Sequence, residues 1–324
     1  MLASNRSTAT VMEKNIPETA TVMEKNIPEK EKGSSKLRIV WRNVYIFAFL
    51  HATSLYAIYL VFTSTLLKTV VFAFVLYVIS GLGITAGVHR LWAHRSYKAK
   101  WPLRLLLAFF NSVAFQNDIY EWSRDHRVHH KFSETDADPH NATRGFFFSH
   151  IGWLLVKKHP DVIEKGKTVD CTDILADPVV RYQRKYYIPL IVLCCFVMPT
   201  VVPAWFWNET YWNAFYVAVI LRYCWTLNIT WLVNSAAHMW GNRPYDRYIN
   251  PRENKYVIVS TMGEGFHNYH HTFPWDYATS ELGFRWNITT MFINFMAFLG
   301  LAYDRKTVCL EVIRKRKERT GDGS

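Results

Sequence analysis

The sequence predicts an all-α integral membrane protein, with four transmembrane helices in two hairpins and a helical cap on the cytosolic side. Three observations lead to this class. Long apolar runs alternate with basic segments, although the mean hydropathy of the 324 residues is only −0.04. Aromatic residues form 16% of the chain, including 13 Trp, which is typical of side chains that line bilayer interfaces. Polar, histidine-rich segments follow each pair of apolar runs and would form the cap.

The N-terminal part carries a direct duplication. Residues 8–18, TATVMEKNIPE, recur unchanged at 19–29. Copies that contain Pro and few core-forming residues are typical of disordered chain. We therefore expect a disordered tail over 1–36, a membrane domain over 37–303 and a basic cytosolic C-terminal tail over 304–324.

Four apolar runs are long enough to cross the hydrocarbon core of a bilayer, which takes about 20 residues. They cover residues 44–62, 69–88, 187–207 and 211–236. Only a few residues separate the first run from the second, and the third from the fourth, so each pair forms a hairpin. Lys and Arg are concentrated outside the two short loops. The positive-inside rule then puts both termini and both histidine-rich segments in the cytosol.

Two shorter apolar runs could change this count. The run at 101–115 is too short to span and contains Arg104, and the run at 285–303 would carry the basic segment RKRKER across the membrane if it spanned. We expect both runs to lie at the membrane interface or against the cap.

Histidines gather in three tight clusters. HRVHH at 126–130 and HNYHH at 267–271 each place three His at i, i+3 and i+4, which share one face of an α-helix. Each triplet is therefore expected to aim three imidazoles into one volume. HRLWAH adds His89 and His94, which lie about 140° apart on an ideal helix. They would converge only if the helix ends or bends near Trp92.

A fourth pair, Asn234 and His238, lies at i and i+4 where the fourth run ends. Under the four-span topology, nine imidazoles and one amide can then meet just outside the bilayer. Nine ligands are too many for one structural zinc ion, which takes four. Two metals with four or five ligands each fit better, and imidazole suits Zn, Cu, Fe and Ni.

Other classes fit the pattern less well. A metal transporter would place its histidines along the spans, whereas here they cluster at and beyond the span ends. The net charge of +12 could attract nucleic acid, but the chain carries no nucleic-acid-binding motif. We therefore expect a dimetal enzyme that contacts membrane lipid and does not bind nucleic acid.

Five segments carry a specific resemblance. They are GITAGVHRLWAHRSYKA (83–99), AFQNDIYEWSRDHRVHHKFSETDADPHN (114–141), GFFFSHIGWLLVKKHP (145–160), TWLVNSAAHMWGNRPYD (230–246) and GEGFHNYHHTFPWDY (263–277). Through them the chain resembles the integral-membrane acyl-CoA desaturases of the stearoyl-CoA Δ9 type and their insect relatives.

This resemblance implies a site for two iron ions (Fe²⁺). The implied ligands are His89, His94, His126, His129, His130, His238, His267, His270 and His271, with Asn234 acting through a water molecule. It further implies O2 as oxidant and electrons from NADH, delivered by cytochrome b5 reductase and cytochrome b5. The implied location is the endoplasmic reticulum membrane.

The implied reaction introduces a double bond into a saturated acyl-CoA of roughly 14–18 carbons, most often at Δ9. Insect relatives leave Δ11 or another pheromone-type position as the alternative, and a membrane di-iron fatty acid or sterol hydroxylase as a more distant one. Residues that the resemblance assigns to CoA and the acyl thioester are Asn43, Asn117, Arg124, Asp125, Lys157, Lys158 and Trp231.

The second apolar run suggests where in the protein the methyl end of the acyl chain would stop. Thr85, Gly81 and Tyr77 stack on the face of His89 at i−4, i−8 and i−12. At a rise of 1.5 Å per residue, Gly81 lies ~12 Å and Tyr77 ~18 Å from His89. We expect Gly81 to leave room for the methyl end of the chain and Tyr77 to close the tunnel.

Several polar residues fall outside this set. Arg222 lies in the middle of the fourth run, where a charge is costly, and we expect a hydrogen bond or ion pair to a neighbouring helix. His51, alone in the first run, is expected to be a satisfied polar core residue. His140, His150 and His159 lie outside the ligand spacing and are not expected to bind metal.

Overall fold

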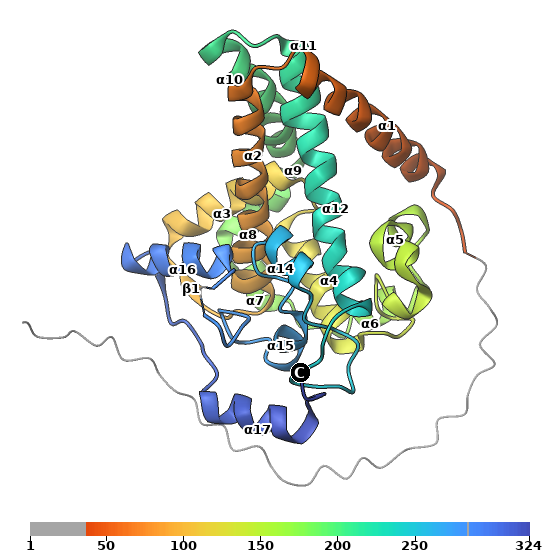
Figure 1. The fold of residues 1–324 in the computed structure, drawn as a ribbon, viewed down its shortest axis with the longest axis vertical. Helices are drawn as coiled ribbons and strands as arrows, with labels where there is room; N and C mark the ends of the chain where they lie inside the picture. The colour runs from red at the N-terminus through yellow and green to blue at the C-terminus, as the bar shows by residue number, and fades with distance from the viewer. Residues whose placement is uncertain (1–36, 284) are drawn as a thin grey trace, which may run out of the picture.

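The computed structural model describes residues 37–283 and 285–324. The duplicated segment and the predicted disordered tail lie outside the described residues. Long helices form one end of the molecule, and shorter helices pack together at the other end (Figure 1). We call this second end the cap.

Among the described residues, four helices are long and apolar enough to cross a membrane: Trp41–Thr63, Leu67–Ala93, Tyr187–Trp207 and Tyr211–Met239. They contain the four predicted spans, which confirms the four-span prediction. Along the chain they are built from α1 (Trp41–Thr63); α2 (Leu67–Leu82) and η1 (Gly83–Ala93); α9 (Tyr187–Ile191), η4 (Val192–Val197) and α10 (Met198–Trp207); and α11 (Tyr211–Ala214), η5 (Phe215–Leu221), α12 (Arg222–Asn234) and α13 (Ala236–Met239).

The segments η1, η4 and η5 are π-helical. A π-helix pairs residue i with residue i+5, so it holds more residues per turn than an α-helix. Side chains within and beyond such a segment therefore point in directions that an α-helical projection does not predict.

The two hairpin turns meet at the end of the molecule away from the cap (Figure 1). Glu209 is buried there and accepts hydrogen bonds from the backbone N–H of Leu66 at 2.9 Å and from Thr69 Oγ1 at 2.7 Å. Its other oxygen accepts from Asn213 Nδ2 at 3.1 Å. A buried carboxylate costs free energy unless it is well bonded, so these contacts hold the hairpins together.

The cap consists of short helices and one pair of two-residue strands. Its elements are β1 (Lys98–Ala99), α3 (Trp101–Ala114), α4 (Ile119–Phe132), η2 (Ala142–Arg144), η3 (Phe148–Gly152), α5 (Trp153–Leu155), α6 (Pro160–Gly166), α7 (Thr172–Ala176), α8 (Pro178–Lys185), α14 (Lys255–Ser260), α15 (His267–Thr272), α16 (Ile288–Phe298), β2 (Ala302–Tyr303) and α17 (Leu310–Thr320). The strands pair antiparallel, with Lys98 opposite Tyr303. This strand pair is a small addition to the predicted all-α fold.

The helices α3 and α16 correspond to the two shorter apolar runs. With 14 and 11 residues they are too short to span. α3 exposes Trp101, Leu105 and Phe109, which recur every four residues, and α16 exposes Met291 and Phe295. Each helix thus has an apolar face turned away from the protein, as expected for interfacial helices.

The largest buried cluster joins the second span to the cap. Val88 of η1 packs in it with Leu103 and Leu107 of α3, Ile119 of α4 and Val180 of α8, all nearly inaccessible to solvent. This packing holds α4, which carries one histidine triplet, against the end of the second span.

Arg222 is buried with 3% of its surface exposed and satisfies its guanidinium on backbone carbonyls. Nη1 donates to Val113 O at 2.9 Å, and Nη2 donates to Cys195 O at 3.3 Å. The expected hydrogen bond to a neighbouring helix is therefore present, and it ties the fourth span to α3 and to η4.

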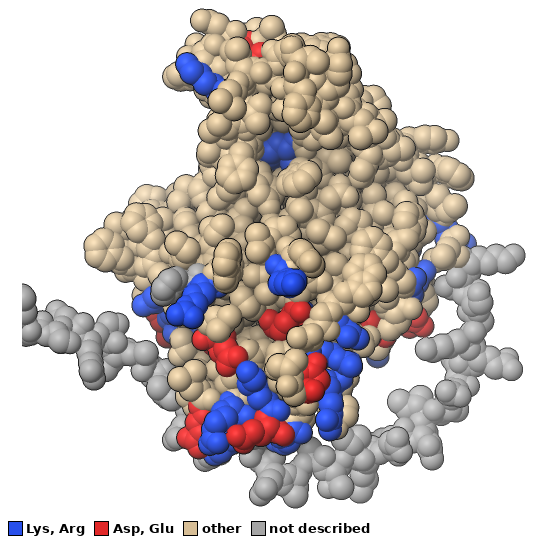
Figure 2. Space-filling model, viewed as in Figure 1, with Lys and Arg blue, Asp and Glu red and all other residues tan. Residues whose placement is uncertain are grey.

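Charged side chains gather on the cap, whereas the other end of the visible face is almost free of them (Figure 2). The last helix, α17, packs on the cap through Ile313, which is buried against Tyr245, Tyr269 and Phe273. Lys317 of the same helix pairs with Glu281 at 3.0 Å. The basic sequence of this segment gave no indication that it packs against the cap.

Candidate metal centre

The helix α4 presents its three histidines because its start is well defined. Asp118 caps the helix by accepting a hydrogen bond from the backbone N–H of Glu121 at 2.9 Å. His126 and His130, at i and i+4, then lie on one line of the helix. His129 lies about 100° away from His130 and faces a different volume.

The helix α15 carries the other triplet and is anchored by the residues between its histidines. Asn268 Nδ2 donates to Asp246 O and to Pro251 O, each at 2.9 Å. Tyr269 donates its hydroxyl to Asp276 Oδ2 at 2.8 Å. These buried bonds turn the three imidazoles inward.

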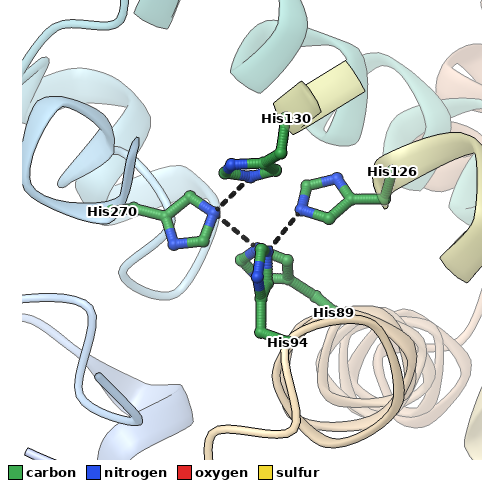
Figure 3. Close-up of side chains that lie close together, drawn as sticks. All are labelled: His89, His94, His126, His130 and His270. Atoms are coloured by element: carbon green, nitrogen blue, oxygen red, sulfur yellow. Dashed lines mark hydrogen bonds between the residues drawn. The ribbon is translucent and has the colours of Figure 1, made fainter. Parts of the chain in front are cut away.

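The histidines form two separate groups. Within each group the possible ligand atoms all lie within 4.8 Å of one another. The five-histidine group contains His89, His94, His126, His130 and His270 (Figure 3). The four-histidine group contains His129, His238, His267 and His271.

Each triplet contributes to both groups. The i and i+4 residues of α4, His126 and His130, join the five-histidine group, and the middle residue His129 joins the other. In α15 the assignment is reversed: His267 and His271 join the four-histidine group, and His270 crosses to the first. The expectation that each triplet serves one volume was therefore wrong, because i+3 and i+4 differ by 100° on a helix.

His89 and His94 converge, and the condition stated for this is met, because the helix ends at Ala93, one residue after Trp92. The backbone of η1 is π-helical, and the N–H of His94 donates to His89 O, five residues back, at 3.0 Å. The two ring centroids lie 4.9 Å apart. The predicted divergence of about 140° applies to an α-helix and not to this segment.

The short distances between the ring nitrogens are explained better by a site for a bound cation than by a network of hydrogen bonds. His270 Nε2 lies 3.0 Å from His89 Nε2 and 2.9 Å from His130 Nε2 (Figure 3). In the second group, His267 Nε2 lies 2.9 Å from His238 Nε2 and 3.2 Å from His271 Nε2.

One ring nitrogen carries at most one hydrogen and cannot donate to two such neighbours. Protonating both nitrogens of these rings is also disfavoured. Burial and the neighbouring imidazoles lower the pKa of the histidines outside the membrane spans well below the usual value of histidine. This holds for His94, His126, His130, His267, His270 and His271. Converging neutral imidazoles are metal-ligand sets.

Three carboxylates orient the rings from behind. Glu264 lies 2.9 Å from His89 Nδ1, Asp138 lies 2.9 Å from His129 Nδ1, and Glu134 lies 2.7 Å from His238 Nδ1. A carboxylate on Nδ1 keeps the hydrogen there and leaves Nε2 free to bind a metal.

Neighbouring side chains keep Glu264 ionised. Burial opposes its ionisation, but Arg90 and His89 outweigh this effect and lower the pKa of Glu264 to about 2. Arg90 donates to it from Nε at 3.0 Å and from Nη2 at 2.7 Å. Similarly, the pKa of Asp138 is lowered despite burial, by His129 and His140.

The sequence pattern did not single out these carboxylates or Arg90. Glu134 and Asp138 directly follow one histidine triplet, and Glu264 lies three residues before the other. Acidic residues beside histidine clusters were the available signal.

The remaining histidines have other partners. His140 Nδ1 lies 3.6 Å from Asp138, in a third possible set that shares His129 with the four-histidine group. His150 bonds with Ser235 Oγ at 3.0 Å. In the first span, His51 contacts Phe47 O at 2.8 Å through Nδ1, as expected for a satisfied core residue.

A cavity runs beside both histidine groups. It is lined by His89 and His126 of the first group, by His129 and His267 of the second, and by Asn234. Its other walls are mostly apolar and include Ile84, Thr85, Ile229 and Val233 of the second and fourth spans. The predicted stack of Thr85, Gly81 and Tyr77 also lines this cavity.

The far end of the cavity is more crowded than expected. Tyr77 donates its hydroxyl to Ser260 O, which joins α2 to α14. A Cβ added at Gly81 would overlap Cε of Met262. The space next to Gly81 is thus filled by a methionine side chain from the other wall.

The seven residues that the resemblance assigned to substrate lie outside this cavity. Asp125 joins two of them, accepting from Arg124 Nη2 at 2.8 Å and from Lys158 Nζ at 2.5 Å. Asn117 and Lys157 are exposed.

The other two are occupied by contacts within the protein. Asn43 Nδ2 donates to Leu154 O at 2.7 Å. Trp231 is buried, with its ring centroid 5.5 Å from that of Phe47.

Residues 64–289 match the family described as fatty acid desaturase. The acyl-CoA Delta-9 desaturase of Acheta domesticus is 62% identical over 296 residues, covering 91% of this chain and 82% of that protein.

Two further relatives are similar over nearly the whole chain. The stearoyl-CoA desaturase 5 of Bos taurus is 62% identical, over 88% of this chain and 85% of its own length. The acyl-CoA Delta(11) desaturase of Spodoptera littoralis is 56% identical, over 91% of this chain and 87% of its own. The chain therefore belongs to the fatty acid desaturase family.

Proposed function

We propose that this protein is an O2-dependent acyl-CoA desaturase. It introduces a double bond into a saturated acyl-CoA of roughly 14–18 carbons, at Δ9. The observation that carries this proposal is the cavity with apolar walls that runs beside two groups of converging imidazoles. The family membership and the Delta-9 relative support it.

Two Fe²⁺ ions would be held by the two histidine groups, with Asn234 reaching one of the ions through a water molecule. When bound, the irons supply the oxidation by O2 that removes two hydrogens from an unactivated chain. Five imidazoles exceed the four ligands of a structural zinc site, which supports a metal with a larger coordination number.

The protein side chains orient the metals and exclude water. Glu264, Asp138 and Glu134 hold the Nδ1 hydrogens of three ligands, so that each Nε2 faces its group. Ile84, Ile229 and Val233 give the acyl chain an apolar wall. The methyl end of the acyl chain would stop at Tyr77 and at the Met262 side chain that fills the space beside Gly81.

The CoA part would remain outside the cavity. Arg124, Lys157 and Lys158 offer cations for its phosphates, and Asp125 orients two of them. Asn43, Asn117 and Trp231 would contact the region around the thioester.

The reaction needs electrons from outside the active site. Removing two hydrogens supplies half of the electrons that reduce O2 to water, and a donor must supply the other two. We assign this role to cytochrome b5, reduced by its NADH-dependent reductase. The cap and both termini would face the cytosol at the endoplasmic reticulum membrane, in agreement with the concentration of charged side chains on the cap.

Regioselectivity has one specific alternative. A Delta(11) desaturase is 56% identical to this chain over 91% of its length, so Δ11 activity is the second candidate.

Expression in desaturase-deficient yeast tests the proposal, with acyl chains analysed by mass spectrometry and double-bond localisation. The expected product is a Δ9 monoene two hydrogens lighter than its precursor, absent with His129→Ala and retained with His159→Ala. A Δ11 monoene would select the alternative. A product heavier by one oxygen, or no product from folded protein supplied with cytochrome b5, would overturn the proposal.

A further inference from the structure

The C-terminal end of the chain is docked on the cap. α17 lies at the end of the cap farthest from the spans (Figure 1), where Ile313 is buried against Tyr245, Tyr269 and Phe273. Ile313 is the single buried residue of α17, all of which the structure describes. Isolated helices of fewer than about 12 residues are marginally stable in water, so the 11-residue α17 depends on this docking. We call α17 and the two residues that follow it, 321–322, the C-terminal clamp.

The C-terminal clamp binds the backbone of the loop between α13 and α14. The backbone N–H of Arg247 donates to Thr320 O at 2.8 Å, and Thr320 Oγ1 donates to Tyr245 O at 2.7 Å. Further along, Asp322 Oδ2 accepts from the backbone N–H of Arg243 at 2.5 Å, and the N–H of Asp322 donates to Arg243 O at 3.2 Å. These bonds join the end of the chain to the loop over several residues.

Two further contacts fix how the C-terminal clamp lies on this loop. Arg316 forms an ion pair with Asp246, whose side chain is 9% exposed. Gly321 lies against Pro244, and a Cβ added to Gly321 would overlap the backbone oxygen of Pro244. A backbone atom cannot turn aside as a flexible side chain can, so a larger residue at this position must move the clamp or the loop.

The same loop holds the histidine helix α15 through Asn268. The backbone N–H groups of Tyr245 and Asp246 donate to Asn268 Oδ1 at 2.9 and 3.1 Å, and Asn268 Nδ2 donates back to Asp246 O at 2.9 Å. Asn268 is fully buried, and in α15 it lies between His267 and His270. Tyr245 and Asp246 thus contact both α15 and the C-terminal clamp.

Both histidine groups share α15. This helix supplies His270 to the five-histidine group, and His267 and His271 to the four-histidine group. A helix of 6 residues has few internal hydrogen bonds, so its position depends on what it packs against. A shift of α15 would therefore displace ligands of both groups at once, whereas a change in one histidine affects its own group.

We propose that the C-terminal clamp positions α15 and thereby determines the metal affinity of both histidine groups. This inference rests on the proposed metal-dependent function. Arg316, Gly321 and Asn268 are positioning residues, since they act on the ligands through the backbone of the loop and of α15. The clamp buries one side chain and otherwise relies on polar contacts, so its detachment costs less free energy than unfolding of the membrane domain. Detachment would loosen the metal ligands in a protein whose spans stay folded.

Two substitutions release the C-terminal clamp in different ways. Gly321→Ala places a Cβ against Pro244 O, and Ile313→Asp puts a charge into the apolar contact with the cap. The matched controls are Ile313→Val, which keeps an apolar side chain, and Gly166→Ala, where a Cβ would meet Val128 at an ordinary 3.8 Å.

Metal retention is measured on purified full-length protein loaded with Fe²⁺, by competition with a chelator. Each clamp variant is also combined with His130→Ala or His271→Ala, which leaves one histidine group intact. We expect Gly321→Ala and Ile313→Asp to weaken metal binding about 10-fold in both combinations, the size of effect that residues behind metal ligands have. The two controls should bind metal as the wild type does. A loss confined to one group, or equal retention by all variants, would overturn the proposal.

Hydrogen exchange on the metal-free protein separates positioning from overall stability. In Gly321→Ala, the backbone N–H groups of α15 should exchange faster than in the wild type, while those of α4 and of the spans are unchanged. Equal acceleration in α4 and α15 would indicate general destabilisation and would contradict a positioning role. This readout needs neither metal nor substrate. A wild type that binds no Fe²⁺ would therefore contradict the proposed function, whereas unchanged exchange in α15 would contradict the role of the clamp.

Discussion

His94 lies one helical turn after His89, and its backbone N–H donates to His89 O at 3.0 Å. This i to i+5 hydrogen bond forms because the helix between the two residues is π-helical. This turn allows two histidines five residues apart to join the same group of five. The helix ends at Ala93, and the hydrogen bond to His89 O keeps the next residue, His94, at the metal centre.

The division into two groups predicts separable metal losses. His130→Ala should reduce bound metal from about two ions per chain to about one, by emptying the five-histidine group, and His271→Ala should do the same for the other. Metal analysis of purified protein measures this. His150→Ala, outside both groups, should keep both ions; loss of both ions from each single variant would contradict independent groups.

The carboxylates behind the histidines should tune metal affinity. Asp138→Asn retains the shape of the side chain but removes the charge beside His129 Nδ1, so affinity of the four-histidine group should fall about 10- to 100-fold. Competition with a chelator measures it. Glu164→Gln, which changes an exposed carboxylate on α6, is the matched control. Equal chelator sensitivity of the two variants would be inconsistent with this role.

The crowded end of the cavity should determine chain length. Gly81→Leu would displace Met262, because a Cβ at this position would overlap the Cε of that side chain. We expect a shift of about tenfold towards shorter acyl chains, the scale on which a hydrophobic pocket discriminates by size. Tyr77→Ala should shift the preference towards longer chains.

Product chain lengths in yeast measure both effects. Gly166→Ala is the glycine control, because a Cβ there meets only Val128, at an ordinary 3.8 Å. If Gly81→Leu left the ratio of palmitoyl to stearoyl products unchanged, this account of the cavity would fail.

Arg222 should act on stability and not on product identity. Arg222→Met leaves the carbonyls of Val113 and Cys195 without their donor, at a cost of about 1–3 kcal/mol. The melting temperature should fall while the double-bond position stays the same. Arg314→Met provides the exposed control. A changed double-bond position at unchanged melting temperature would instead assign Arg222 to the reaction.

Glu253 should make stability depend on pH in a definite direction. Burial raises its pKa to about 8, although its Oε1 accepts the N–H of Tyr269 at 2.9 Å. The raised pKa means that the folded state favours the neutral acid. This contribution is complete below the unfolded pKa and is lost as pH rises towards 8.

Glu253→Gln keeps an acceptor without the titration. Its melting temperature relative to the wild type should therefore increase between about pH 5 and about pH 9. Taking the difference between the two proteins removes the pH dependence that metal binding imposes on both. Glu311→Gln, an exposed change on α17, should show no such trend. A difference that stays constant with pH would show that Glu253 does not titrate in this range.

The spans and the nine histidines could be predicted from the sequence because both depend on local order. Length and apolarity determine whether a helix can cross a bilayer, and the four predicted runs lie inside the four long helices. The i, i+3, i+4 spacing placed the triplets on helix faces. The role of Arg222 as a hydrogen-bond donor between helices was also anticipated, although its partners were not.

The sequence by itself therefore determined which segments span and which residues converge on one end of the molecule. Only the tertiary structure decided how the histidines divide, since this depends on the rotation of α4 and α15 relative to each other and on the π-helical turn at His89. It also decided which carboxylates lie behind the rings and that Met262 fills the space beside Gly81. These contacts join residues far apart in the chain, and no local period of the sequence carries information about such packing.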